Sequence, residues 1–190
     1  GKAVLCEKPF AVNASQVKQM IQKAKEENML LMEGMWSRFP PLMEKVRNII
    51  ANHEIGEIRT IHAYFGFRPE TKNIEGRLFN PKLAGGSLLD VGIYPVSLSF
   101  MLNGKPDSFV TDWTIGETGV DEQASIIFKY LNGSMAVLHS SIQSDTGQEA
   151  FISGTEGTIR IHKQCWKPQS MTLSKWKTDE TKEIEIPFIG

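Results

Sequence analysis

The second half of the chain consists largely of short runs rich in β-branched and aromatic residues, with turn residues between them. These strand-like runs are SFVTDWTI, QASIIFKY, SMAVLHSSI, EAFIS, TIRIH, MTLSKW and KEIEIPF. Tight turns at residues 131–133 and 154–157 separate neighbouring runs, and such turns typically connect antiparallel strands. We therefore expect a large, mostly antiparallel sheet in this part of the chain.

A longer strand and a helix precede these runs. Residues 58–65 alternate with a period of two and have largely apolar residues on both faces, which predicts a sheet covered on both sides. One face is expected to meet helices, and the other a partner, a terminal segment or solvent. After a polar loop over residues 68–81, a helix is expected from Ser87 to Asn103, because Gly104 and a nearby proline are stop signals.

The first part of the chain has a different pattern. Residues 3–7 form a short apolar run that ends at Lys8, where the following proline disfavours helix. Asn13 is expected to cap a helix that ends near Asn28. The run MLLMEGM then predicts a second strand, and the two prolines at positions 40 and 41 introduce a second amphipathic helix.

Alternating strands and helices are typical of a parallel α/β layer. A parallel sheet needs several strands to bury both faces, so residues 3–7 are interpreted as the last strand of a larger upstream sheet. The expected fold class is α+β, with an open antiparallel sheet and helices on one face. We place the remnant of the α/β sheet at residues 1–35 and the α+β domain at residues 36–190.

Composition excludes several classes of protein. Hydrophobic residues make up 41% of the chain, charged residues 23%, and the formal net charge is -1, so no basic field favours nucleic acid or anionic lipid. Apolar runs are interrupted by polar residues, and no signal peptide is recognised, which predicts a cytoplasmic protein without a membrane anchor. Cys6 and Cys165 are too few for a disulfide framework, and the scattered histidines predict no metal site.

Three residues are candidates for chemistry, although each has a simpler interpretation. Lys8 is equally consistent with a surface charge, Asp90 with a capping box that begins at Ser87, and Tyr94 with a core aromatic residue. Asp90 and Tyr94 are four residues apart, so they project from the same face of the expected helix. Pro95 follows within that helix and breaks its hydrogen-bond pattern, which is typical of a functional position.

Several motifs together resemble a known family. They are GKAVLCEKPFAVNASQ, MEGMWSRFPP, FGFRPE, RLFNPKLAGGSLLDVGIYPVS and SGTEGTIRI. The chain is similar to the C-terminal domain of the glucose-fructose oxidoreductase, inositol dehydrogenase and rhizopine-catabolism (Gfo/Idh/MocA) family, in particular its dimeric dihydrodiol dehydrogenase branch. The resemblance implies an NAD(P)-dependent dehydrogenase acting on secondary alcohols, with residues 1–35 as the remnant of a Rossmann domain and a homodimer formed through the sheet.

The resemblance also implies a catalytic group of Lys8, Asp90 and Tyr94, with Lys8 beside the nicotinamide. A free tyrosine titrates near pH 10 and needs a nearby cation to act as a base at neutral pH, and Lys8 is that cation in this hypothesis. Tyr94 would accept the hydroxyl proton of the substrate, and Asp90 would orient Lys8 or the substrate. Many family members have histidine in place of this tyrosine, and the tyrosine resembles dihydrodiol dehydrogenases and some sugar dehydrogenases.

Other expected site residues follow from the same resemblance. Glu7 and Pro9, which flank the lysine, and Arg38 are assigned to cofactor binding. Substrate binding is assigned to Trp36, Phe65 and Arg77. The alternatives are that the aromatic residues belong to the core and that Arg38 is a surface cation stacked on a ring.

The chain contains no GxGxxG motif, so the phosphate-binding turn of a dinucleotide fold is not in it. We therefore expect a C-terminal-domain fragment that binds NADP or NAD poorly by itself and is inactive alone, and the sequence does not distinguish the two cofactors. The substrate is expected to be a trans-dihydrodiol or a sugar such as xylose or glucose. A non-catalytic assembly or cofactor-sensing domain is the alternative function.

Overall fold

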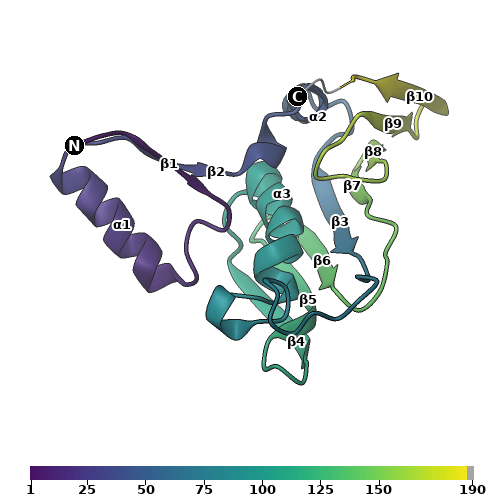
Figure 1. Ribbon diagram of the computed structural model, residues 1–190. Helices are drawn as coiled ribbons and strands as arrows, with labels where there is room; N and C mark the ends of the chain where they lie inside the picture. Colours follow the sequence, from purple (N-terminus) through teal and green to yellow (C-terminus); the bar gives the residue numbers. More distant parts are fainter. Residues whose placement is uncertain (188–190) are drawn as a thin grey trace. The chain divides into compact units, whose positions relative to one another are not determined.

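A computed structural model describes residues 1–187 of the chain, which form two compact units (Figure 1). The smaller unit is Gly1–Trp36, and the larger unit begins at Ser37. The expected boundary at residues 35 and 36 differs from this division by one residue, and the assignment of the smaller unit to a Rossmann domain stays a prediction.

The smaller unit is one strand–helix–strand element. Strand β1 (Val4–Glu7) pairs in parallel with β2 (Leu31–Gly34), and helix α1 (Ala14–Glu26) connects them. The side chain of Asn13 accepts a hydrogen bond from the backbone N–H of Gln16 at 3.0 Å, which confirms the expected cap. Helix α1 has no buried residue, because a two-stranded sheet offers little surface to pack on.

The larger unit is built on an eight-stranded sheet with the order β10-β9-β8-β7-β3-β6-β5-β4. Strands β3 and β6 are parallel, and the other neighbouring pairs are antiparallel, as expected. The strands are β3 (Ile58–Gly66), β4 (Ser108–Ile115), β5 (Asp121–Lys129), β6 (Met135–Ser141), β7 (Ala150–Gly154), β8 (Gly157–Ile161), β9 (Ser170–Lys175) and β10 (Glu180–Glu185). Phe188, the last residue of the run expected for β10, lies outside the described residues.

Two helices cover one face of this sheet. Helix α2 (Pro41–Ala51) buries Leu42, Met43, Val46 and Ile49 in the main core. The core continues into β3 through Ile61 and Ala63, neither of which is exposed to solvent. Figure 1 shows helix α3 (Ile93–Asn103) lying across the strands, where it contacts β3 and β6.

Within the larger unit the other, open face of the sheet carries no covering element among the residues described, and the expected partner, terminal segment or solvent on that face stays a prediction. On β3, Thr60, His62 and Tyr64 are half-buried or exposed, whereas their neighbours Ile61 and Ala63 are buried. Alternate residues of a strand point to opposite faces. Strand β3 therefore has one fully apolar face, which packs in the core, and one face whose side chains carry polar groups that tolerate water.

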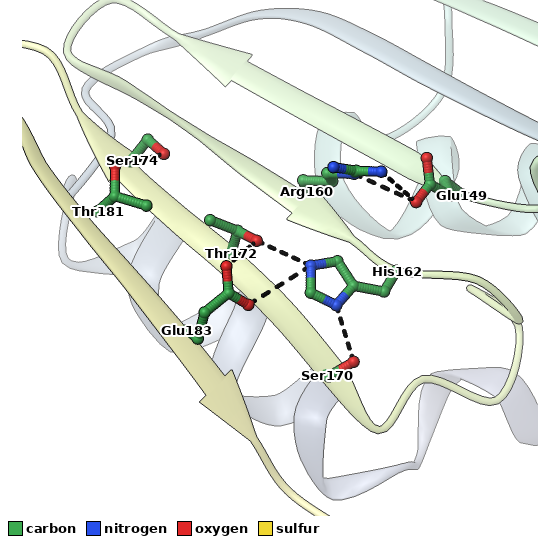
Figure 2. Close-up of polar contacts among 8 residues, drawn as sticks. All are labelled: Glu149, Arg160, His162, Ser170, Thr172, Ser174, Thr181 and Glu183. Atoms are coloured by element: carbon green, nitrogen blue, oxygen red, sulfur yellow. Dashed lines mark hydrogen bonds and ion pairs between the residues drawn. The ribbon is translucent and has the colours of Figure 1, made fainter.

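Polar residues cover the open face of the last three strands (Figure 2). The two ring nitrogens of His162 lie 2.9 Å from Ser170 Oγ and 2.8 Å from Thr172 Oγ1. Thr172 donates its hydroxyl hydrogen to Glu183 at 2.6 Å, and Arg160 donates to Glu149 at 2.7 Å. These side chains satisfy one another, so this part of the face needs no apolar cover.

The helix expected from Ser87 is present and has an irregular start. A short 3-10 turn, η2 (Pro81–Leu83), precedes it, and a π-helical turn, η3 (Leu88–Gly92), leads directly into α3. Gly104 ends the helix with φ 73°, which confirms the expected stop. The wide turn lies just before Pro95, whose missing N–H prevents regular helical hydrogen bonding, and π-turns of this kind are frequent at functional sites.

The helical stretch Pro81–Asn103 is long and apolar enough to cross a membrane by length and composition alone. A stretch of this length was not expected from the sequence, in which polar residues interrupt the apolar runs. The same composition is typical of a core helix, and this stretch packs on β3 and β6 with 44% of its most apolar window buried.

Candidate active site

Tyr94 lies on an aromatic cluster in the larger unit. Its ring centroid is 5.6 Å from that of Phe65, on β3. Phe65 in turn stacks on Trp166, from the segment between β8 and β9, at 3.7 Å with nearly parallel rings. Strand β3, helix α3 and the β8–β9 connection thus bring three aromatic side chains together, and they hold the Tyr94 ring in a defined orientation.

A narrow crevice next to Tyr94 contains Arg38 and Cys165. Arg38 donates from Nε to Ser97 Oγ at 3.0 Å and from the guanidinium to the Ser97 carbonyl at 3.4 Å, so it is fixed against helix α3. Burial raises the pKa of the Cys165 thiol to about 12. The thiol is therefore protonated at neutral pH and is a poor nucleophile in this crevice.

Asp90 is paired with the polar loop that precedes the helix. Its carboxylate is 2.6 Å from the guanidinium of Arg77, and the side chain of Asp90 is 13% exposed while that of Arg77 is 73% exposed. The sequence hypothesis paired Asp90 with Lys8 or the substrate, and it placed Arg77 on the substrate. The structure pairs the two with each other, and this ion pair fastens the loop to the first turn of the helix, while the expected contacts of Asp90 with Lys8 or the substrate and of Arg77 with the substrate stay predictions.

A second ion pair fastens the same loop. Lys72 Nζ is 2.8 Å from Oε1 of Glu122, which is nearly buried on β5, and 3.1 Å from exposed Glu117. Gln143 donates to the other oxygen of Glu122 at 2.7 Å. Burial acts to raise the pKa of Glu122, but the hydrogen bonds from Lys72 and Gln143 outweigh it and hold the pKa below its usual value.

Lys8, Glu7, Pro9 and Trp36 belong to the smaller unit. Lys8 follows β1 directly, at the carboxyl end of a parallel strand, which is where ligands bind in open α/β sheets. A cation at this position suits a nucleotide cofactor, and the assignment of Glu7 and Pro9 to cofactor binding stays a prediction. The approach of these four residues to Tyr94 stays a prediction, since it depends on how the two units meet.

Sequence reasoning missed two features of the larger unit. Trp166 lies in the segment QCWKP, which has no periodic pattern, so nothing linked it to Tyr94. The Lys72–Glu122 pair joins residues 50 positions apart, and only the fold brings them together. The one signal in the sequence was Glu122, which directly precedes a run predicted as a strand. A charged group that is buried in a sheet requires a partner.

The sheet and the helices define an α+β domain that carries Tyr94, and comparison with known proteins specifies it further. Residues 43–160 match the family model described as the GFO/IDH/MocA C-terminal domain. The chain belongs to this family.

Curated relatives are similar over essentially the whole chain. Trans-1,2-dihydrobenzene-1,2-diol dehydrogenase from Mus musculus is 40% identical over 192 residues, covering 100% of this chain and 55% of the relative. The protein of the same name from Homo sapiens is 35% identical and covers 98% of this chain and 54% of the relative. The chain thus spans about half the length of these relatives.

Solved structures share the fold. A 3-ketoreductase from Actinomadura kijaniata, in complex with NADP and TDP-benzene, has a TM-score of 0.86 at 24% identity and covers 98% of this chain and 58% of its own. Aldose-aldose oxidoreductase from Caulobacter crescentus has a TM-score of 0.86 at 22% identity, with 99% and 57% covered. The α+β class expected from the sequence is confirmed.

Proposed function

We propose that this chain is the catalytic half of an NAD(P)-dependent dehydrogenase that oxidises a secondary alcohol. The observation that carries the proposal is the placement of Tyr94 on an aromatic cluster, at the start of a π-distorted helix, in a domain that belongs to the Gfo/Idh/MocA family. The similarity to dihydrodiol dehydrogenases supports the reaction class. The nucleotide-binding half would lie outside this chain.

In this proposal Tyr94 takes the proton of the substrate hydroxyl at its phenolic oxygen. Lys8 places its ammonium beside that oxygen, because a neighbouring cation favours the deprotonated phenol. Bound nicotinamide would supply the hydride acceptor. Glu7 and Pro9 shape the strand end on the cofactor side. Arg38, fixed to Ser97, lines the crevice from the larger unit.

Aromatic side chains would form the apolar wall of the substrate site. Phe65 and Trp166 stack beside Tyr94, and Trp36 would extend the wall from the smaller unit. Flat rings of this kind favour a ring-shaped substrate such as a trans-dihydrodiol. The Arg77–Asp90 ion pair would close the polar side of the site through the loop.

A sugar such as xylose or glucose is the second candidate substrate. The observation in its favour is the polar side of the site, where the Arg77 guanidinium and the Asp90 carboxylate offer hydrogen bonds to several hydroxyls. A panel of dihydrodiols and aldoses, assayed with the full-length protein and both cofactors, would distinguish the two substrates.

The test of the proposed function is Tyr94→Phe in the full-length protein. Loss of the phenolic oxygen should lower turnover about 100-fold or more while cofactor affinity is retained. Tyr64→Phe is the matched control, since this tyrosine is on the open face of β3 and should leave turnover unchanged. Near-normal turnover of Tyr94→Phe would end the assignment.

We also propose a homodimer formed through the open face of the sheet, in the cytoplasm. Half-buried Val137 and Ile127 are paired across β5 and β6 on that face, which also carries the polar network of β8–β10. The two free cysteines fit a reducing compartment. Val137→Glu should convert dimer to monomer in light scattering of the full-length protein, and Leu131→Glu in an exposed turn should not. A monomeric wild-type protein would refute the dimer.

A further inference from the structure

The start of the helix that carries Asp90 and Tyr94 is held by a residue from another strand. The carboxylate of Asp121, the first residue of β5, accepts a hydrogen bond from the backbone N–H of Leu88 at 2.7 Å. The same oxygen accepts the hydroxyl hydrogen of Ser87 at 2.7 Å. Ser87 itself makes no capping bond to the helix backbone, so Asp121 takes the place of a local cap.

Buried and closely packed groups surround this contact of Asp121. Ser87 is fully buried, and its hydroxyl oxygen is also 3.0 Å from that of Ser140 on β6. Gly86 has φ 119°, and a Cβ atom there would overlap Oδ1 of Asp121. A Cβ on Gly92 would lie 2.9 Å from the Ser140 hydroxyl oxygen. Two glycines therefore allow the helix start to approach β5 and β6 closely.

The contact has an electrostatic component as well. The first N–H groups of a helix carry a partial positive charge and attract a carboxylate. Here the carboxylate belongs to strand β5 of the sheet rather than to the loop before the helix. The first turn of the helix is therefore fixed relative to the sheet, and Phe65, which contacts Tyr94, is on that same sheet.

We propose that Asp121 is a positioning residue for the reaction, an inference that rests on the proposed function. By fixing the wide turn Leu88–Gly92 against β5, Asp121 sets where Asp90 and Tyr94 are presented. Gly86 is required for the same reason, because any side chain at this position displaces the carboxylate.

The experiment uses the full-length protein with its cofactor and compares Asp121→Ala, Asp121→Asn and Asp112→Asn. Asp112 is an exposed control on the edge strand β4. A displaced reacting group typically costs up to about 100-fold in rate. We expect kcat per cofactor-binding site to fall about 10- to 100-fold in Asp121→Ala. Asp121→Asn keeps an acceptor oxygen and should retain more activity, and the control should match wild type.

Three readouts separate positioning from a purely structural role. The pH profile of kcat/KM should shift in Asp121→Ala, because the phenol is displaced from its cation, whereas cofactor affinity should not change. Amide hydrogen exchange at Leu88–Asp90 should speed up in both Asp121 variants. Gly86→Ala should lower kcat similarly, and adding Asp121→Ala to it should cause less than an additive further loss, because both changes disturb one contact.

The outcomes are distinct from those that test the proposed function. If Tyr94→Phe abolishes turnover while Asp121→Ala keeps kcat per site and the pH profile within twofold of wild type, Asp121 has no positioning role. If Tyr94→Phe itself is active, the proposed function fails and this inference fails with it. If Asp121→Ala does not fold, Asp121→Asn and Gly86→Ala are measured in the same way and decide the question.

Discussion

The two units of the chain differ most in how far their apolar residues are buried. In the larger unit, Leu42 and Ile61 are fully excluded from solvent, within a core formed by two helices and one face of the sheet. In the smaller unit, Leu5 is 70% exposed and α1 buries no residue. The larger unit therefore has a core of its own, whereas the smaller unit presents apolar surface of the kind that parallel sheets normally cover.

This difference suggests that the two units contribute different things. In the proposed mechanism the larger unit supplies Tyr94 as the proton-transferring side chain, and its core supplies most of the stability. The smaller unit supplies Lys8 at the end of β1 in the same mechanism, and its own packing contributes little to the free energy of unfolding. Stability and activity should accordingly respond to substitutions in different units.

The largest effect is expected on activity, from Lys8 in the smaller unit. Lys8→Met in the full-length protein should lower turnover about 100-fold or more, since the phenol would lose its cation. Steady-state kinetics and thermal unfolding measure the two quantities, and the unfolding midpoint should not change. Lys2→Met, at an exposed position, is the control. Turnover of Lys8→Met within twofold of wild type would remove Lys8 from the mechanism.

The next prediction concerns stability and compares the same substitution, leucine to alanine, in both units. Leu42→Ala should cost about 2–5 kcal/mol in the free energy of unfolding, because it opens a cavity in a sealed core. Leu5→Ala, at a largely exposed position, should cost about 0.5 kcal/mol or less. Chemical denaturation of this chain measures both. Equal costs would show that the smaller unit has a core after all.

A smaller effect should depend on pH. The pKa of Glu122 is lowered in the fold, so its stabilisation is complete above the unfolded pKa of about 4.3 and is lost as the pH falls through the folded value. Glu122→Gln should therefore cost about 1–2 kcal/mol at pH 7 and less below pH 4. Glu117→Gln, at an exposed position, should cost much less. A constant difference between pH 7 and pH 3 would contradict the assigned role of this ion pair.

Features that depend on local sequence were predictable. Residues 108–115 have the alternation and flanking signals of a strand and form β4 with those bounds. Asn13 and Gly104 were identified as helix ends from residue type alone, and both are confirmed. These predictions succeeded because caps and turns rely on the chemistry of a few neighbouring residues.

Features that depend on distant contacts were not predictable. The cap from Asp121 and the stacking of Trp166 join segments that only the fold brings together. The sequence did not show what meets the open face of β3, because threonine, histidine and tyrosine are found at covered and at exposed positions. Resemblance to a family identified the candidate residues, but it gave neither the partner of Asp90 nor the anchoring of the loop.

The central claim is that Lys8 and Tyr94 meet in one site. A crystal structure of the full-length protein with its oxidised cofactor would measure the distance between Lys8 Nζ and the Tyr94 phenolic oxygen directly. We expect about 3 Å, within hydrogen-bond reach, with the nicotinamide beside both groups. Side chains separated by more than about 10 Å in that complex, beyond direct contact or a bridging water, would contradict the proposed mechanism.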